Sequence, residues 1–288
     1  MTETLNVDGW LAWAEKQLAA RGVTEVRANV EWIMAHALRT GRGELKLHAS
    51  RTLNLKQEKS FRYLIDQRAR RVPLAYVLGS QPFLGLDIQV GEGALIPRPE
   101  TEELVDEASH LFKPRAQESL NILEIGTGTG CIAVALATLF PRSVVYATDI
   151  SEQALSLARK NSDLHHCTRQ IRFISEDLFK PDHQRRGWAD LVISNPPYIP
   201  TAEIDRLDPE VRREPRLALD GGPDGLNHLK AVIADAPSTL KRGGWLALEI
   251  GSDQGAAIRK LLAAQGFEEV VVRRDAQGHE RMALARRS

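Results

Sequence analysis

From about residue 118 onward, the chain alternates between short apolar runs and longer segments with helical spacing. The apolar runs lie at residues 120–125, 144–148, 171–174, 191–194 and 245–250. The helical segments lie at residues 131–140, 152–160, 229–240 and 254–265. This alternation predicts a mostly parallel sheet with helices on both faces. Two last runs, at 269–273 and 281–285, can pair antiparallel, so we expect an α/β fold with a seven-stranded, Rossmann-like sheet.

Residues 1–73 have a different pattern. Apolar residues such as Val26, Val30 and Ile33 recur at helical spacing, and Pro73 would end a later helix. We therefore expect a small helical bundle as a first domain. It holds 13 Lys and Arg against 8 Asp and Glu, a net charge of +5 in a chain that is neutral overall. Solvated helix faces would explain this surplus, and so would a docking surface for an acidic or RNA-bearing partner.

Residues 74–97 change to a period of two, which predicts a β-hairpin linking the bundle to a sheet domain at 98–288. The alternating apolar residues are Leu84, Leu86, Ile88 and Val90.

Composition limits the compartment and the partners. The chain has only Cys131 and Cys167, so no disulfide framework is indicated. It shows neither a secretory signal nor an apolar run long enough to span a membrane. Zero net charge gives no general attraction to nucleic acid or membrane. We therefore expect a cytoplasmic protein, which we also expect to be monomeric. No cluster has metal-ligand spacing, so we expect no metal.

A rigid polar turn follows the apolar run at 191–194. Its sequence is Asn195-Pro196-Pro197-Tyr198. The Asn offers an acceptor and a donor, and the prolines hold the Pro196 carbonyl in place as a second acceptor. Tyr198 adds a flat apolar wall. Because open α/β sheets bind ligands at the carboxyl ends of their strands, this turn predicts a pocket for a planar group that carries an NH2.

A glycine-rich loop follows the first predicted strand of the sheet. It runs from Glu124 through Gly126, Thr127, Gly128 and Thr129 to Gly130. Its G-x-G-x-G spacing differs from the dinucleotide fingerprint, which disfavours a pyrophosphate. Asp149 ends the next strand, where a carboxylate accepts from ribose hydroxyls, although it could also cap a helix.

The predicted nucleoside site is completed by two residues that follow the third strand, Asp177 and Leu178. Asp177 could accept from an adenine amine, or could simply be a turn residue, and Leu178 could cover the ring. A nucleoside without phosphates beside an amide-holding turn fits S-adenosylmethionine, which would leave as S-adenosylhomocysteine. Transfer of its methyl group would depend mainly on alignment of the acceptor nitrogen, the methyl carbon and the sulfur.

These motifs resemble a class I S-adenosylmethionine-dependent methyltransferase of the amino-methylating type. Further stretches are similar to the peptide chain release factor glutamine methyltransferases. They lie at residues 73–79, 95–102, 214–219 and 221–226. The ribosomal protein L3 glutamine methyltransferases are near relatives, and the segment 98–102 favours the release factor branch. Some relatives have an aromatic residue where this chain has Leu178.

The resemblance implies the reaction. The acceptor would be the side-chain nitrogen of the glutamine in the Gly-Gly-Gln motif of release factors. Asn195 and the Pro196 carbonyl would accept from its NH2 and favour the pyramidal nitrogen of the transition state. Tyr198 and Pro197 would line the glutamine stem, with Arg98 and Glu102 shaping the pocket.

Two other functions stay open. An adenine amino-methyltransferase acting on nucleic acid would meet the same donor pattern, but the chain has neither a target-recognition insert nor a basic excess in its second part. A non-catalytic scaffold could bind the nucleoside and a partner. We expect the helical domain to recognise the protein substrate.

Overall fold

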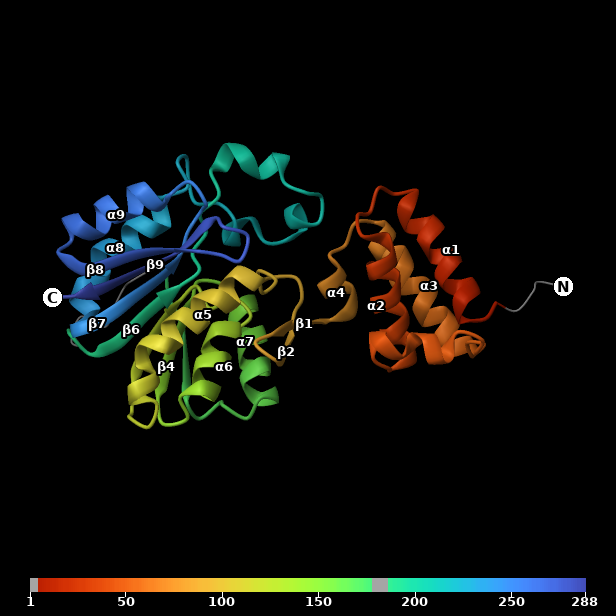
Figure 1. The fold of residues 1–288 in the computed structure, drawn as a ribbon, viewed down its shortest axis with the longest axis horizontal. Helices are drawn as coiled ribbons and strands as arrows, with labels where there is room; N and C mark the ends of the chain where they lie inside the picture. Colours follow the sequence, from red (N-terminus) through yellow and green to blue (C-terminus); the bar gives the residue numbers. More distant parts are fainter. Residues whose placement is uncertain (1–4, 178–185) are drawn as a thin grey trace. The chain divides into compact units, whose positions relative to one another are not determined.

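The computed structural model describes residues 5–177 and 186–288. By contacts within the chain, it divides into two compact units (Figure 1). Unit 1 is Met1–Ser80 together with Asp208–Arg213, and unit 2 is Gln81–Leu207 together with Glu214–Ser288. The chain therefore passes between the units three times. None of the helices in the described ranges is long and apolar enough to cross a membrane.

Unit 1 is a helical bundle. Its elements are α1 (Val7–Ala19), α2 (Val26–Leu38), the 3-10 helix η1 (Arg42–His48), α3 (Leu55–Ala69) and α4 (Leu74–Leu78). Asn54 caps α3, since its side chain accepts from the Lys56 and Gln57 backbone while the Gln57 side chain accepts from the Asn54 backbone. The core contains Trp10, Ile33 and Phe61, all of them buried. This apolar interior holds the bundle together.

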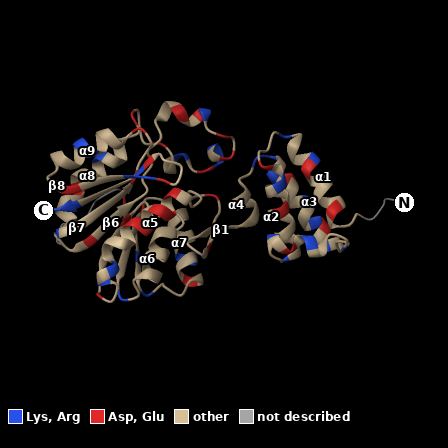
Figure 2. Cartoon of the chain, in the orientation of Figure 1, with Lys and Arg blue, Asp and Glu red and all other residues tan. Residues whose placement is uncertain are grey.

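Charges of both signs cover the helices of unit 1, as Figure 2 shows for α1, α2 and α3. Arg27 pairs with both Glu15 and Glu31, and Arg62 pairs with Glu58. On these helices the positive surplus found in the sequence is therefore interspersed with acidic groups.

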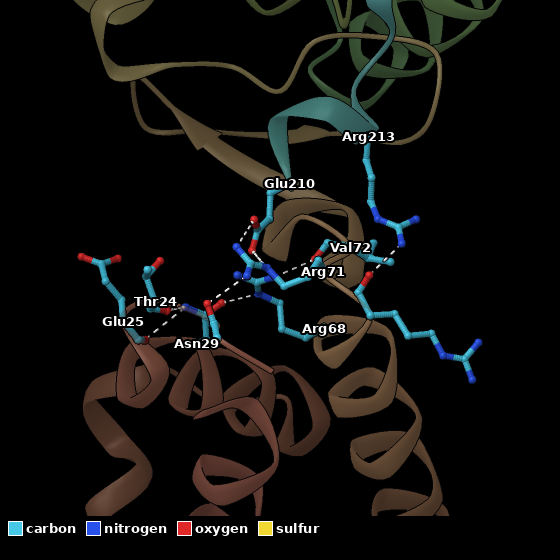
Figure 3. Close-up of polar contacts among 10 residues, drawn as sticks. Thr24, Glu25, Asn29, Arg68, Arg71, Val72, Glu210 and Arg213 are labelled. Carbon is cyan, nitrogen blue, oxygen red and sulfur yellow. Dashed lines mark hydrogen bonds and ion pairs between the residues drawn. The ribbon is translucent and has the colours of Figure 1, made fainter. Parts of the chain in front are cut away.

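The short segment Asp208–Arg213 joins unit 1 through an ion-pair cluster (Figure 3). The Glu210 carboxylate accepts two hydrogen bonds of 2.6 Å from Arg71 and lies 2.8 Å from the buried Arg68 guanidinium. Arg68 also donates to the Asn29 side chain at 2.6 Å. Burial raises the pKa of Glu210, but the bonds from Arg71 and Arg68 outweigh it and lower the pKa to about 2. The carboxylate is therefore charged and paired at neutral pH.

The predicted hairpin is present, with strands β1 (Ser80–Phe83) and β2 (Leu86–Gln89). The placement of Leu84 in a strand was wrong, because Leu84 and Gly85 form the turn with φ of 48° and 77°. Two positive φ values are what a tight hairpin turn needs to match strand twist. The Glu102 carboxylate accepts from the Leu84 backbone N–H at 3.0 Å and so supports the turn.

Unit 2 contains the seven-stranded sheet that the sequence predicts. Its strands are β3 (Asn121–Ile125), β4 (Val144–Asp149), β5 (Ile171–Ser175), β6 (Ala189–Ser194), β7 (Leu240–Glu249), β8 (Phe267–Arg274) and β9 (Glu280–Arg287). Their order is β5-β4-β3-β6-β7-β9-β8. The first five strands of this order run parallel, while β9 pairs antiparallel with both β7 and β8.

Helices cover the sheet. They are α5 (Pro99–Phe112), α6 (Cys131–Leu139), α7 (Glu152–Leu164), α8 (Asn227–Thr239) and α9 (Gly255–Ala264). Four short 3-10 helices complete the described elements: η2 (Lys113–Arg115), η3 (Thr201–Arg206), η4 (Val211–Arg213) and η5 (Arg216–Ala218). Helix α6 is apolar on nearly all sides and is buried along most of its length. Such burial fixes the position of the glycine-rich loop that precedes it.

Candidate active site

Three motifs predicted from the sequence meet at one edge of the sheet. Strand β3 is central and pairs in parallel with β4 and β6, with Ile125 opposite both Thr148 and Ser194. The next residues along these strands are Gly126, Asp149 and Asn195, so the three loops leave the sheet side by side. The Ser194 hydroxyl donates to the Ile125 carbonyl at 2.7 Å and ties two of the strand ends together.

The glycine-rich loop depends on backbone conformations that favour glycine. Gly126, Gly128 and Gly130 have φ of 71°, 55° and 79°. A Cβ added at Gly126 or Gly128 would meet nothing within 4 Å, whereas one at Gly130 would lie 2.9 Å from the Ala158 side chain. Gly130 thus allows close packing of α6 on α7, and the first two glycines border open space that a ligand can occupy.

Glu124 is fully buried at the start of this loop. Its Oε2 accepts from the Thr127 hydroxyl at 2.7 Å, while its Oε1 has no hydrogen-bond partner within the described residues. Burial is the main cause that raises the pKa of Glu124 to about 8, and the charge of Asp149 adds to it. An unpartnered, buried carboxylate oxygen fits the cationic amino group of an amino-acid-like ligand, since opposite charge would compensate its burial.

Asp149 connects the second strand end to the glycine loop. One oxygen accepts from the Gly128 N–H at 2.9 Å, and the other accepts from the Ser151 N–H at 2.9 Å. Capping of α7 falls to Ser151, whose hydroxyl accepts from Ala154. Burial raises the pKa of Asp149 against these backbone bonds. Because each carboxylate oxygen can accept more than one hydrogen bond, Asp149 keeps acceptor capacity for ribose hydroxyls.

The predicted adenine contacts lie at the end of β5. Asp177 is exposed two residues beyond that strand, and the strand pairs with β4 in parallel. Asp177 therefore lies on the same edge of the sheet as Asp149. Leu178 lies outside the described residues.

The turn after β6 is held by a buried polar network. Asn195 Nδ2 donates to the Thr101 hydroxyl at 2.9 Å, and that hydroxyl donates to Glu249 Oε2 at 2.6 Å. The Tyr198 hydroxyl donates to Glu249 Oε1 at 3.1 Å. Pro196 is buried beside Asn195, and its carbonyl accepts no hydrogen bond from the described part of the chain. Two oxygen acceptors, Asn195 Oδ1 and Pro196 O, thus remain for a ligand.

Glu249 ends strand β7, which pairs with β6, and it is buried. Burial raises the pKa of Glu249 to about 7, against hydrogen bonds from Thr101 and Tyr198 that lower it. Burial also raises the pKa of the Tyr198 hydroxyl, and the Glu249 charge adds to that shift. Tyr198 therefore stays protonated and donates to the carboxylate.

The loop after Tyr198 is packed too tightly for side chains at two glycines. A Cβ at Gly225 would lie 2.4 Å from the Tyr198 carbonyl, and one at Gly221 would lie 2.8 Å from the Tyr198 Cα. The Gln254 side chain donates to the Tyr198 carbonyl at 3.0 Å and to the Gly225 carbonyl at 3.2 Å. These contacts fix the backbone around Tyr198, which explains the glycines of segment 221–226. Pro197 lies partly buried within this turn.

Glu214 connects two of the sequence motifs within unit 2, the segments 95–102 and 214–219. Its buried carboxylate accepts from the Ile96 N–H at 2.8 Å and pairs with the Arg98 guanidinium. Arg98 is the N-cap residue of α5, and Thr101 lies in the first turn of the same helix. The Arg98–Glu214 pair therefore orients the helix end that brings Thr101 to Asn195.

Thr101, Glu214 and Glu249 were not predicted as site residues. Thr101 and Glu214 stand in the stretches that carry the family resemblance, and Glu249 ends a strand beside that of Asn195. An acidic residue at the carboxyl end of a parallel strand was the available signal for Glu249. The partners of all three, however, are far away in the sequence.

Comparisons with known proteins give a family model for each part of the chain and a similar fold. A family model described as the PrmC N-terminal domain matches residues 9–79, and one described as the methyltransferase small domain matches residues 101–207. A methyltransferase from Pyrococcus furiosus shares the fold, with a TM-score of 0.52 at 20% identity over 80% of this chain and 97% of that one.

Curated relatives extend the match over nearly the whole chain. The release factor glutamine methyltransferase of Geobacter sulfurreducens is 39% identical over 277 residues, which are 96% of this chain and 95% of the relative. The enzyme of the same name from Moorella thermoacetica is 40% identical over 279 residues, 96% of this chain and 97% of the relative. The chain belongs to the release factor glutamine methyltransferase family.

Proposed function

We propose that this protein transfers a methyl group from S-adenosylmethionine to the side-chain amide nitrogen of the glutamine in the Gly-Gly-Gln motif of peptide chain release factors. The observation that carries the proposal is the pair of acceptors next to the glycine loop, Asn195 Oδ1 and Pro196 O, which accept no hydrogen bond from residues 5–177 or 186–288. A primary amide has two N–H donors, one for each acceptor. Tyr198 and Pro197 border the same turn and would line the glutamine stem.

The cofactor would lie along the three neighbouring strand ends. Glu124 would face its amino group and Asp149 its ribose, with the open space at Gly126 and Gly128 for the chain between them. Thr127, Thr129 and Gly130 shape this loop, and Asp177 would contact the adenine. When bound, S-adenosylmethionine supplies a methyl carbon made electrophilic by the sulfonium sulfur.

The protein's own contribution is alignment and electrostatics. An amide nitrogen is a poor nucleophile because its lone pair is conjugated with the carbonyl. Acceptors placed for the pyramidal nitrogen stabilise the transition state more than the planar ground state. They also hold the nitrogen toward the glycine loop. As the N–C bond forms, the S–C bond would break and its electron pair would stay on sulfur. The nitrogen becomes acidic only after attack, so its proton can then pass to water and no strong general base is needed early.

We further propose that unit 1 recognises the release factor, because residues 1–73 carry a net charge of +5 and unit 1 is compact apart from the unit that holds the glycine loop. In this scheme Arg98 and Glu102 shape the pocket indirectly. Arg98 holds the start of α5 through its ion pair with Glu214, and Glu102 holds the hairpin turn through its hydrogen bond from the Leu84 N–H. A cytoplasmic, monomeric protein would suit this substrate.

The test is a methylation assay on purified release factor, ribosomal protein L3 and DNA, with wild type and Asn195→Ala. We expect label on the release factor alone, and a loss of transfer of about 100-fold or more in Asn195→Ala, as for removal of an oxyanion-hole donor. Cofactor affinity should persist. Asn121→Ala is the matched control, because Asn121 begins β3 and so lies at the end of that strand away from the glycine loop. Label on DNA or L3 instead, or unchanged turnover in Asn195→Ala, would refute the proposal.

A further inference from the structure

We propose that Thr101 and Glu249 are positioning residues, which hold the Asn195 carboxamide with its oxygen, rather than its NH2, toward the acceptor amide. The inference rests on the proposed function for the identity of the acceptor. Thr101 and Glu249 are buried behind the turn. In this scheme, the orientation of the Asn195 carboxamide determines which groups can bind there as methyl acceptors.

Counting hydrogens determines the orientation. A threonine hydroxyl has one hydrogen, and an ionised carboxylate can only accept. Above about pH 7 the Glu249 carboxyl is mostly ionised. Across the 2.6 Å contact, the Thr101 hydroxyl therefore gives its hydrogen to Glu249. Only lone pairs of Thr101 then face Asn195, at 2.9 Å, so Asn195 must present its NH2 to Thr101. Its oxygen is left on the other side of the amide group.

The second oxygen of Glu249 supports the same direction of hydrogen bonding, from Asn195 to Thr101 and from Thr101 to Glu249. It accepts from the Tyr198 hydroxyl at 3.1 Å, so two neutral donors converge on one carboxylate. Both Thr101 and Glu249 are almost completely buried, and water therefore cannot replace either donor at little cost. The network is fixed from three elements: α5 for Thr101, the end of β7 for Glu249, and the turn after β6 for Asn195 and Tyr198.

A flipped Asn195 would be unproductive. Its NH2 would point toward the NH2 of the acceptor amide, and two donors would face each other. The productive orientation offers an acceptor to an NH2 donor, and it selects against ligands that present only an acceptor there, such as a carbonyl oxygen. Thr101 and Glu249 thus affect specificity without touching the substrate.

Several charged or titratable groups surround Glu249. Glu100 on α5 disfavours its charge, and Arg281 on β9 favours it. Cys131 on α6 lies close enough for Glu249 to raise the pKa of its thiol. Tyr198 completes the set. Protonation of Glu249 would allow the carboxyl to donate to Thr101, which would free the Thr101 hydrogen for Asn195 Oδ1 and reverse the amide.

The kinetic test compares Glu249→Gln and Thr101→Val with the matched control Thr101→Ser. At saturating cofactor, we expect kcat for release factor methylation to fall about 10- to 100-fold in the first two, the factor expected for one charge-assisted hydrogen bond. Thr101→Ser keeps the hydroxyl and should restore kcat to within about threefold of wild type. The wild-type kcat should rise with pH through about 7, the value for Glu249. Glu249→Gln should lack this rise, which a purely structural role would not predict.

A second readout is independent of activity. In protein with 15N-labelled asparagine, the Asn195 side-chain NH2 signal can be assigned by its loss in Asn195→Asp. We expect this signal to titrate with pH in wild type, to be displaced in Thr101→Val, and to show no titration in Glu249→Gln. An Asn195 signal unaffected by both substitutions would overturn the inference, even if release factor is methylated. A signal that responds as expected, in a protein that leaves release factor unmethylated, would refute the proposed function instead.

Discussion

Replacing Glu124 by Gln should remove the pH dependence of cofactor binding. In the free protein the pKa of Glu124 is raised to about 8, so the carboxyl is mostly protonated at pH 7. Ionising it there costs about 1.4 kcal/mol for each pH unit below the pKa. Because a cationic amino group favours the ionised form, binding should release a proton and tighten as the pH rises. The ionised fraction grows from about 1% at pH 6 to about 24% at pH 7.5, which predicts about 20-fold tighter binding.

Isothermal titration calorimetry with S-adenosylhomocysteine at pH 6, 6.5, 7 and 7.5 measures this directly. Repeating each titration in two buffers with different ionisation enthalpies gives the number of protons released. In Glu124→Gln, the affinity should be independent of pH over this range and about 10- to 100-fold weaker than wild type at pH 7.5. Wild-type affinity that stays constant or weakens between pH 6 and 7.5 would refute the reasoning. Equal affinity in Glu124→Gln at pH 7.5 would do the same.

Two further substitutions test the packing around the site and the attachment of the segment Asp208–Arg213 to the rest of unit 1. Gly130→Ala places a Cβ 2.9 Å from the Ala158 side chain at a φ of 79°, so the free energy of unfolding should fall by about 2–4 kcal/mol in urea denaturation. Glu210→Gln leaves the buried Arg68 uncompensated, and we expect a loss of about 1–3 kcal/mol, reduced because Glu210 is partly exposed. Since its pKa is lowered to about 2, this stabilisation is present above about pH 4.5 and is lost as the pH falls through 2.

Matched controls separate these causes. Gly278→Ala has a similar φ of 87° but open space around the added Cβ, so it should cost only the backbone strain of about 1 kcal/mol. Glu58→Gln breaks an exposed pair with Arg62 and should change stability by less than about 1 kcal/mol. If each control costs as much as its partner substitution, then neither the close contact at Gly130 nor the burial of Arg68 explains the effect.

The sequence predicted the sheet well, because strand and helix patterns are local. Each apolar run became a strand, and the alternation itself implied that loops after neighbouring strands meet at one edge. The positions of Asn195 and Asp149 beside the glycine loop follow from that rule. The helical bundle was recognisable for the same reason, since its apolar spacing is local.

The rest depended on tertiary contacts that no local pattern contains. Thr101 and Glu249 meet across 148 positions in the chain, and neither stands in a run that indicates its partner. Glu210 reaches Arg71 across 139 positions, so the membership of its segment in unit 1 was not predictable from composition. Leu84 continued the period-two alternation but lies in the turn, because Gly85 beside it allows a tight reversal.

Mass spectrometry of a release factor after incubation with this protein and S-adenosylmethionine would decide whether the proposed reaction occurs. We predict a gain of one methyl group, located by fragmentation on the glutamine of the Gly-Gly-Gln motif and absent with Asn195→Ala. A release factor of unchanged mass, or a methyl group found on any other residue, would contradict it.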